Sequence, residues 1–190
     1  MKILPMVLLL TSVATATVWA QRPKLSPGTR QFVTVDEAVV ALTHVRVIDG
    51  TGAAAMQDQT VVISDGVIRS IAPSASAVVP EGAKTIDLSG ASVIPGLVMV
   101  HEHLFYPTGG LPLYSEQAFS FPRMYLAGGV TTMRTGGSME PYTDINVRRM
   151  IDAGSMPGPK IDVTGPYLER SDALFQVHSL TGPEDARQMV

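Results

Sequence analysis

Residues 93–104 read Val-Ile-Pro-Gly-Leu-Val-Met-Val-His-Glu-His-Leu, and this stretch decides the fold. A Pro-Gly turn opens a short apolar run typical of a buried strand, and His101 and His103 close it. On a β-strand, residues i and i+2 face the same side, with Cβ atoms roughly 6–7 Å apart. Two imidazoles at that spacing can bind one metal ion, with Zn–N distances of about 2.0–2.1 Å. The two histidines are therefore candidate metal ligands at the C-terminal end of a strand, where α/β sheets place their chemistry.

The His-x-His motif is weak when it stands alone, because two strand histidines can equally be satisfied by backbone carbonyl groups. Glu102 stands between them and points to the opposite face of the strand, so an outer contact is expected for it rather than a metal. The neighbouring sequence has to decide between the two interpretations.

Two further strand patterns follow the first at a regular spacing. The three strands begin near Leu97, Val130 and Ile161, at intervals of 33 and 31 residues. Helix patterns over 115–127 and 141–154 fill the intervals. A strand, a helix and two loops at this period form the βα unit of a parallel sheet, which predicts an α/β fold.

Residues 95–190 have room for only part of a TIM-type (β/α)8 barrel. Such a barrel takes about 30 residues per unit, so this segment holds about three units of eight. A capping-box pattern at 181–184 opens a last helix, which reaches Val190 without a stop signal. We expect an N-terminal fragment of a longer enzyme, and the alternative is a small three-stranded α/β domain.

Residues 38–94 carry short strand patterns and turn signals, which predict a small antiparallel β-sandwich subdomain. In its first strand, Val45 and Val47 share one face, and His44 lies on the other, where a solvated position is expected. Asp65-Gly66 is a two-residue hairpin turn signal between two further strands.

The N-terminal segment differs in composition from the rest of the chain. Residues 1–20 combine Lys2, an apolar stretch and small residues before a cleavage position after Ala20, which predicts a signal peptide and a secreted or periplasmic protein. The alternative is an uncleaved membrane anchor. Residues 21–37 are polar and carry prolines, so a flexible lead-in is expected.

Bulk composition excludes several classes of function. The formal net charge is −3, without a basic block, so nothing favours nucleic acid or an anionic membrane surface as a partner. The chain has no cysteine, which excludes disulfides, thiolate metal sites and a cysteine nucleophile.

In combination, these pieces resemble the metal-dependent amidohydrolase superfamily, especially its secreted branch similar to imidazolonepropionase and Xaa-Pro dipeptidase. The likeness covers residues 40 to 190, and four stretches carry it. They resemble the opening strand of the family's β-sandwich (45–50), its hairpin (62–68 with Ile71), its first barrel strand (93–104) and its second (128–134).

The resemblance implies a (β/α)8 barrel with a β-sandwich built from both chain ends. It also implies hydrolysis of C–N bonds by one or two divalent metals, usually zinc, which activate a water molecule and polarise the carbonyl. His101 and His103 would hold the first metal. The family's other ligands and its catalytic aspartate come from later strands, beyond Val190, so this chain is expected to be inactive alone.

This chain departs from the family's pattern at two positions. Met99 stands where relatives commonly have Asp or Asn, and we expect it to share the inward face with the two histidines. Thr135 stands where many relatives have Asp. Neither change removes a ligand.

Four other residues are weaker candidates for the site. Tyr106 and Tyr114 follow the first strand and could contact substrate, although loop packing is the simpler expectation. Arg134 could bind a substrate carboxylate or form an ion pair, and His178 is expected to lie in a surface loop.

We therefore expect a metal-dependent hydrolase that acts on C–N bonds other than ordinary peptide bonds, with metal-bound water as the nucleophile. Its substrates would be small amides, cyclic amides or Xaa-Pro-type dipeptides, with no stable membrane association after signal cleavage. The alternative is a non-catalytic, truncated amidohydrolase-like protein that at most binds metal weakly. A secreted β-rich binding module is disfavoured by the βα period.

Overall fold

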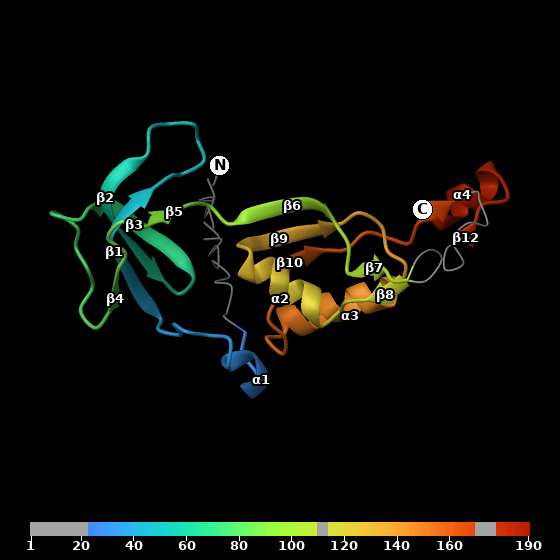
Figure 1. Ribbon diagram of the computed structural model, residues 1–190, viewed down its shortest axis with the longest axis horizontal. Coiled ribbons are helices and arrows are strands. Elements are labelled where there is room, and N and C mark those ends of the chain that lie inside the picture. The colour runs from blue at the N-terminus through green and yellow to red at the C-terminus, as the bar shows by residue number, and fades with distance from the viewer. Residues whose placement is uncertain (1–22, 110–113, 170–177) are drawn as a thin grey trace, which may run out of the picture.

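The computed structural model describes residues 23–109, 114–169 and 178–190, so the expected signal peptide lies outside the described residues. Figure 1 shows two parts side by side, a β-sheet and a part that combines strands with helices. The Pro-Gly turn of residues 95–96 stands between them in the chain. The mixed α/β class expected from the sequence is confirmed.

The first part is one five-stranded sheet with strand order β3-β2-β1-β4, in which β5 also pairs with β1. Its strands are β1 (Val39–Val47), β2 (Met56–Ser64), β3 (Val67–Pro73), β4 (Lys84–Asp87) and β5 (Ser92–Val93). The expected β-sandwich has two packed sheets, and the described residues form one here. The sandwich therefore stays a prediction.

Two local expectations for this sheet are confirmed. Asp65 and Gly66 join β2 to β3 with φ of +51° and +76°, the pair of positive values that a tight type I′ hairpin turn requires. Val45 and Val47 of β1 are buried with Val61 of β2 in the sheet's core cluster.

The expectation of a wholly antiparallel arrangement is wrong. Strands β4 and β5, which lie inside the stretch expected to be antiparallel, both run parallel to β1. They pair with successive parts of the same edge, Val40–Thr43 and Arg46–Val47. This edge of β1 would otherwise expose a long row of unpaired backbone groups, which two short strands satisfy in turn.

The second part is built on a parallel three-stranded sheet with order β10-β9-β6, where the sequence predicted three βα-type strands. The strands are β6 (Leu97–Glu102), β9 (Val130–Thr135) and β10 (Lys160–Asp162), and the connecting helices are α2 (Ser120–Ala127) and α3 (Pro141–Asp152). The positions at which the strands begin are confirmed to within one residue.

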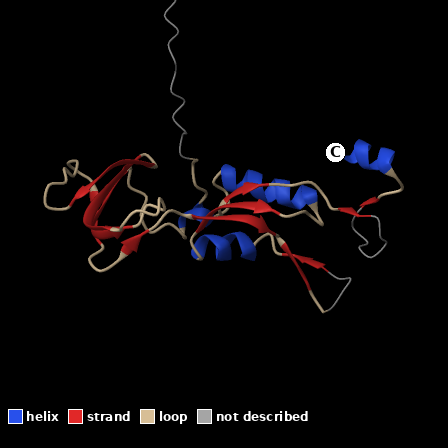
Figure 2. Cartoon of the chain, turned by 90° about the horizontal axis from the view of Figure 1, so that it is seen from above, coloured by secondary structure: helices blue, strands red, loops and turns tan. Residues whose placement is uncertain are grey.

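Figure 2 shows helices lying beside the strands of this part. Side chains of α2 and α3 pack together with the sheet in one buried cluster. Leu104, Met133 and Ile161 lie in it with Val147 of α3, and side chains of α2 pack around them. By contrast, Val98 and Val100 of β6 are 64% and 75% exposed. The sheet is thus buried on its helix-covered face and carries exposed apolar side chains elsewhere on β6.

The structure differs from the expected elements in three places. Helix α2 begins at Ser120, not near residue 115, because residues 114–116 form strand β8 (Tyr114–Glu116), which pairs with β7 (Phe105–Pro107) as an antiparallel hairpin. The expected flexible lead-in contains a helical turn, α1 (Pro27–Arg30). The backbone N–H of Ser26 at its start donates to the carbonyl of Gly154, which ties this segment to the loop after α3.

At the end of the chain, β11 (Leu168–Glu169) pairs in parallel with β12 (His178–Ser179), and α4 (Pro183–Met189) follows. Thr181 contacts Asp185 through its backbone N–H and its hydroxyl, in place of the expected capping box with Glu184. Within the described residues, no helix has the length and apolarity needed to cross a bilayer.

Candidate metal site at the end of strand β6

His101 and His103 stand at the C-terminal end of β6, at the edge where the neighbouring parallel strand β9 also ends. Their ring centroids are 5.1 Å apart and the ring planes are nearly perpendicular, at 85°. Two imidazoles that bind one tetrahedral zinc through nitrogens about 2.0–2.1 Å away hold their ring centres about 5 Å apart. The pair thus has the spacing that a shared metal ion needs.

A bulge in β6 changes which side chains share a face with the histidines. The register with β9 shifts between Met99 and Glu102, which inserts one extra residue and reverses the inward–outward alternation. Met99 packs instead in the helix-side cluster near Met133. The expectation that Met99 shares the face of the histidines is therefore wrong, and the reason is the bulge.

Glu102 faces the helices, as its sequence position predicted. Its carboxylate accepts a hydrogen bond from the hydroxyl of Tyr125 on α2 at 2.9 Å, and the same hydroxyl lies 3.0 Å from the carbonyl oxygen of His103. Burial raises the pKa of Tyr125, so this hydroxyl remains a donor. These contacts hold the end of β6 against α2 and give Glu102 a structural role.

Two glycines after β9 allow close packing at the histidine pair. A Cβ on Gly136 would overlap the His101 ring at its Cδ2, Nε2 and Cε1 atoms. Gly137 has φ of +114°, and a Cβ there would lie 2.5 Å from Cε1 of Tyr167. The backbone after β9 can therefore approach the rings of His101 and Tyr167 only because Gly136 and Gly137 carry no side chains.

Thr135, the second departure from the family's pattern, anchors this glycine pair. Its side chain is fully buried, and its Oγ1 accepts a hydrogen bond from the backbone N–H of Thr164 at 2.8 Å. The hydroxyl of Thr164 in turn accepts from the backbone N–H of Gly137 at 2.9 Å. Thr135 therefore ties the ends of the second and third parallel strands together at the site.

Two acidic groups lie close to the site, one buried and one half-buried, and sequence reasoning missed both. Asp144 of α3 is 1% exposed, and its carboxylate lies beside the hydroxyl of Ser138. Burial raises the pKa of Asp144. Burial, with Asp144 and Glu140 as neighbouring acidic groups, raises the pKa of Glu116 in β8 to about 7. No local pattern marks either residue, because one lies on a helix and the other on a short hairpin.

The four weaker candidates from the sequence make packing, ion-pair or strand contacts, or are exposed. Arg134 lies 3.6 Å from a carboxylate oxygen of Asp162 on the next strand, which is the ion pair considered as its alternative role. Tyr106 is exposed on β7, and Tyr114 packs edge-on against Phe105 with ring centroids 5.5 Å apart. The backbone of His178 lies in β12 and pairs with Leu168.

The histidine pair does not make a complete metal site within the described residues. Across 23–109, 114–169 and 178–190, no three His, Cys, Asp or Glu side chains are arranged to hold one ion. Catalytic zinc sites typically have three protein ligands. The donor chemistry and the spacing of the pair fit a metal ion. The two donors are one fewer than the three protein ligands of a typical catalytic zinc site.

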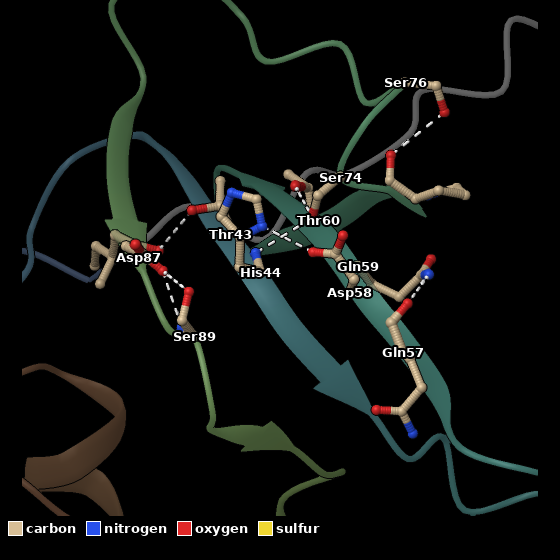
Figure 3. A network of polar contacts seen from close by, with 12 residues as sticks. Thr43, His44, Gln57, Asp58, Gln59, Thr60, Ser74, Ser76, Asp87 and Ser89 are labelled. Carbon is tan, nitrogen blue, oxygen red and sulfur yellow. Dashed lines mark hydrogen bonds and ion pairs between the residues drawn. The ribbon is translucent and has the colours of Figure 1, made fainter.

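A second polar cluster lies in the β-sheet, where only a solvated histidine was expected (Figure 3). His44 and Asp58 face each other across β1 and β2 with positive φ of +55° and +49°, at register shifts between the strands. Nδ1 of His44 is 2.8 Å from Oδ1 of Asp58. Together with Arg46, Gln57 and two residues of the 90–91 turn, they line an open hollow of about 340 Å³.

Comparison with known proteins finds that the chain is similar to amidohydrolases. It is 35% identical to an enamidase of Eubacterium barkeri over 123 residues, which is 65% of this chain and 30% of the enamidase. It is 31% identical to an imidazolonepropionase of Nocardia farcinica over 104 residues, 54% of this chain and 26% of that enzyme. Dihydroorotases are also among the relatives. No family model matches the chain.

Solved structures give the same result. A Bifidobacterium longum protein provisionally identified as a prolidase superposes with a TM-score of 0.62 at 31% identity, covering 79% of this chain and 36% of that protein. The chain thus spans between about a fifth and just over a third of the length of these relatives. The resemblance to the amidohydrolase superfamily, inferred from the sequence, is confirmed.

Proposed function

We propose that this chain, a relative of amidohydrolases, supplies the first metal-ligating strand of a hydrolase that cleaves C–N bonds other than ordinary peptide bonds. The observation that carries the proposal is the pair His101 and His103, with rings 5.1 Å apart at the end of β6.

His101 and His103 would hold a divalent metal, and zinc is the ion that we infer, because it suits imidazole nitrogen. Bound there, the metal would supply Lewis acidity, lowering the pKa of water toward about 7 and polarising a carbonyl group. The chain's own residues orient the two rings. Gly136 packs against one ring, while the Gly137 carbonyl and the Tyr167 hydroxyl lie near Nδ1 of the other.

We further infer that β6, β9 and β10 are the first three strands of a (β/α)8 barrel and that β1 to β5 belong to a small β-sandwich. Strands of a parallel barrel are buried on both faces and are therefore apolar on both. Val98 and Val100 are exposed in this chain, which supports a further layer over this part of β6. The parallel order β10-β9-β6 is the order that successive βα units produce.

The substrate class that we propose is a small amide, a cyclic amide or a Xaa-Pro-type dipeptide. The names of the relatives support it, since they include an enamidase, an imidazolonepropionase and a protein provisionally identified as a prolidase. Beside His103 lie the aromatic rings of Phe105 and Tyr167, with centroids 4.8 Å and 6.3 Å from the imidazole. Such a wall suits a compact, partly apolar substrate.

The alternative is a non-catalytic protein that binds metal weakly, and one observation favours it for the chain by itself. The described residues provide two nitrogen donors and no third ligand. We therefore expect this 190-residue chain to bind zinc weakly and to hydrolyse nothing alone, with the activity belonging to a protein that contributes the missing donors.

The test compares the chain with its His101→Ala/His103→Ala double variant and with His44→Ala as the matched histidine control. Zinc affinity is measured by calorimetry, and hydrolysis is followed on a cyclic amide and a Xaa-Pro dipeptide. Weak zinc binding that disappears only in the double variant supports the metal site. Equal zinc binding in all three proteins contradicts it, and tight zinc with turnover by wild type contradicts the statement that the chain is incomplete.

We also propose that the protein works outside the cytoplasm, in the secreted or periplasmic compartment. The composition of residues 1–20 supports this, with its positive start, apolar stretch and small residues before Ala20. N-terminal sequencing of the mature protein from its native host is expected to begin at Gln21. A mature protein that retains Met1 would contradict the proposal.

A further inference from the structure

Two oxygens lie near Nδ1 of His103, and they differ in the hydrogen bonds that they can form with it. The carbonyl oxygen of Gly137 is 3.4 Å away and the hydroxyl oxygen of Tyr167 is 3.3 Å away. A carbonyl oxygen only accepts hydrogen bonds, whereas a phenol hydroxyl can donate or accept. The two contacts therefore bear on which ring nitrogen of His103 carries the proton.

The carbonyl of Gly137 favours one tautomer of the neutral ring. If Nδ1 is protonated, it donates toward the carbonyl, and Nε2 keeps its lone pair. If Nδ1 is unprotonated, its lone pair faces the lone pairs of the carbonyl, and Nε2 carries the proton and is blocked for a metal. Only in the first state can both neighbouring oxygens accept a hydrogen bond from Nδ1, with the Tyr167 oxygen as the second acceptor.

The surrounding residues hold Tyr167 in this place. Its ring centroid is 6.3 Å from that of Phe105 and 6.3 Å from that of His103. The absence of a Cβ at Gly137 leaves room for the Tyr167 ring against the backbone. Thr164 accepts the N–H of Gly137 at 2.9 Å, so the peptide that precedes the critical carbonyl is itself fixed.

We propose that Tyr167 is a positioning residue, whose hydroxyl oxygen shares with the Gly137 carbonyl the proton on Nδ1 of His103 and so leaves Nε2 free for a divalent cation. Oxygen partners of this kind orient metal-binding histidines and fix their tautomer. The link from the tautomer to the cation rests on the proposed function, while the tautomer is a property of the chain without metal.

The test replaces the hydroxyl alone, with Tyr167→Phe in the full chain. The matched control is Tyr142→Phe on α3, whose side chain is 79% exposed. The tautomer of His103 in the metal-free protein is read from the ¹⁵N shifts of its ring, assigned by replacing the four histidines one at a time. Zinc affinity is measured on the same samples.

In wild type and in Tyr142→Phe, we expect His103 to carry its proton on Nδ1. In Tyr167→Phe, the fraction with the proton on Nδ1 is expected to fall, and zinc affinity is expected to fall about tenfold, at the low end for loss of such a partner. A lower Nδ1–H fraction with no zinc binding by any protein would support the positioning role and overturn the metal function.

Two results overturn the positioning role. One is an unchanged tautomer in Tyr167→Phe. The other is a rise in the Nδ1–H fraction or in zinc affinity, which would mean that the hydroxyl donates to Nδ1 and opposes metal binding. If the variant does not fold, the wild-type spectrum decides, since a proton on Nε2 of His103 in wild type also contradicts the proposal.

Discussion

The hydroxyl oxygens of Thr135 and Thr164 lie 3.0 Å apart, at the ends of two neighbouring parallel strands and 29 positions apart in the chain. Each also accepts a backbone N–H, Thr135 that of Thr164 and Thr164 that of Gly137. These contacts fix the course of the backbone after β9. Gly136 and Gly137, which contact the rings of His101 and Tyr167, lie in this segment. The residue that departs from the family's common Asp is thus part of the support of the site.

Thr135→Val is expected to destabilise the fold by about 1–3 kcal/mol, because it leaves the half-buried N–H of Thr164 without its acceptor. Thr135→Ser keeps the hydroxyl and should lose less stability, because only the methyl group is missing. Denaturant unfolding of the three proteins measures the difference. Equal stability of the Val and Ser variants would show that the hydroxyl contributes nothing.

Gly136→Ala is expected to displace the imidazole of His101, because the new Cβ would occupy the position of its ring atoms. Zinc affinity should fall by at least about tenfold, since ligands must sit within a few tenths of an ångström of their distance to the ion. Gly66→Ala is a control for the cost of altering a glycine, since nothing lies within 4 Å of its Cβ position, although its own positive φ adds strain. Unchanged zinc affinity in Gly136→Ala, or an equal loss in Gly66→Ala, would contradict the packing argument.

The free energy of unfolding should depend on pH through Glu116. Burial raises its pKa from 4.5 to about 7 in the folded chain, so the native state holds this proton more tightly than the unfolded state. Stability from this group is fully present below pH about 4.5 and is lost as pH rises through about 7. Relative to wild type, Glu116→Gln should gain stability across that window and then remain level.

The exposed Glu81 offers a control of the same chemistry, as Glu81→Gln. Unfolding midpoints of the variants are compared with wild type from pH 4 to pH 8. A difference between wild type and Glu116→Gln that does not change with pH would contradict the raised pKa of Glu116, and a change of the same size in Glu81→Gln would assign the effect to net charge.

Leu104→Ala should cost about 2–5 kcal/mol, because Leu104 is fully buried where the site meets the helix-covered core. Leu126→Ala on α2, where the leucine is 40% exposed, should cost much less. Chemical denaturation gives both values. Similar losses at the two positions would mean that the cluster around Leu104 is not the core of this part of the chain.

Local sequence patterns predicted those features that depend on a few neighbouring residues. The Asp65-Gly66 turn followed from the need for two positive φ values, and the strands near Leu97 and Val130 followed from apolar or β-branched runs that begin directly after a glycine. The βα spacing then predicted a parallel arrangement. The hairpin of β7 and β8 was missed because its two strands have three residues each and show no alternation that a pattern could reveal.

The sequence by itself determined the turns, the parallel strand order and the presence of two histidines one residue apart, because these depend on periodicity and on backbone preferences over short stretches. Only the tertiary structure decided which groups surround that pair. A bulge that no local pattern marks moved Met99 to the helix side, and the Thr135–Thr164 contact brought Gly137 and Tyr167 to His103. Such contacts join residues 29 to 64 positions apart, so they exist only once the strands have paired and the side chains have packed.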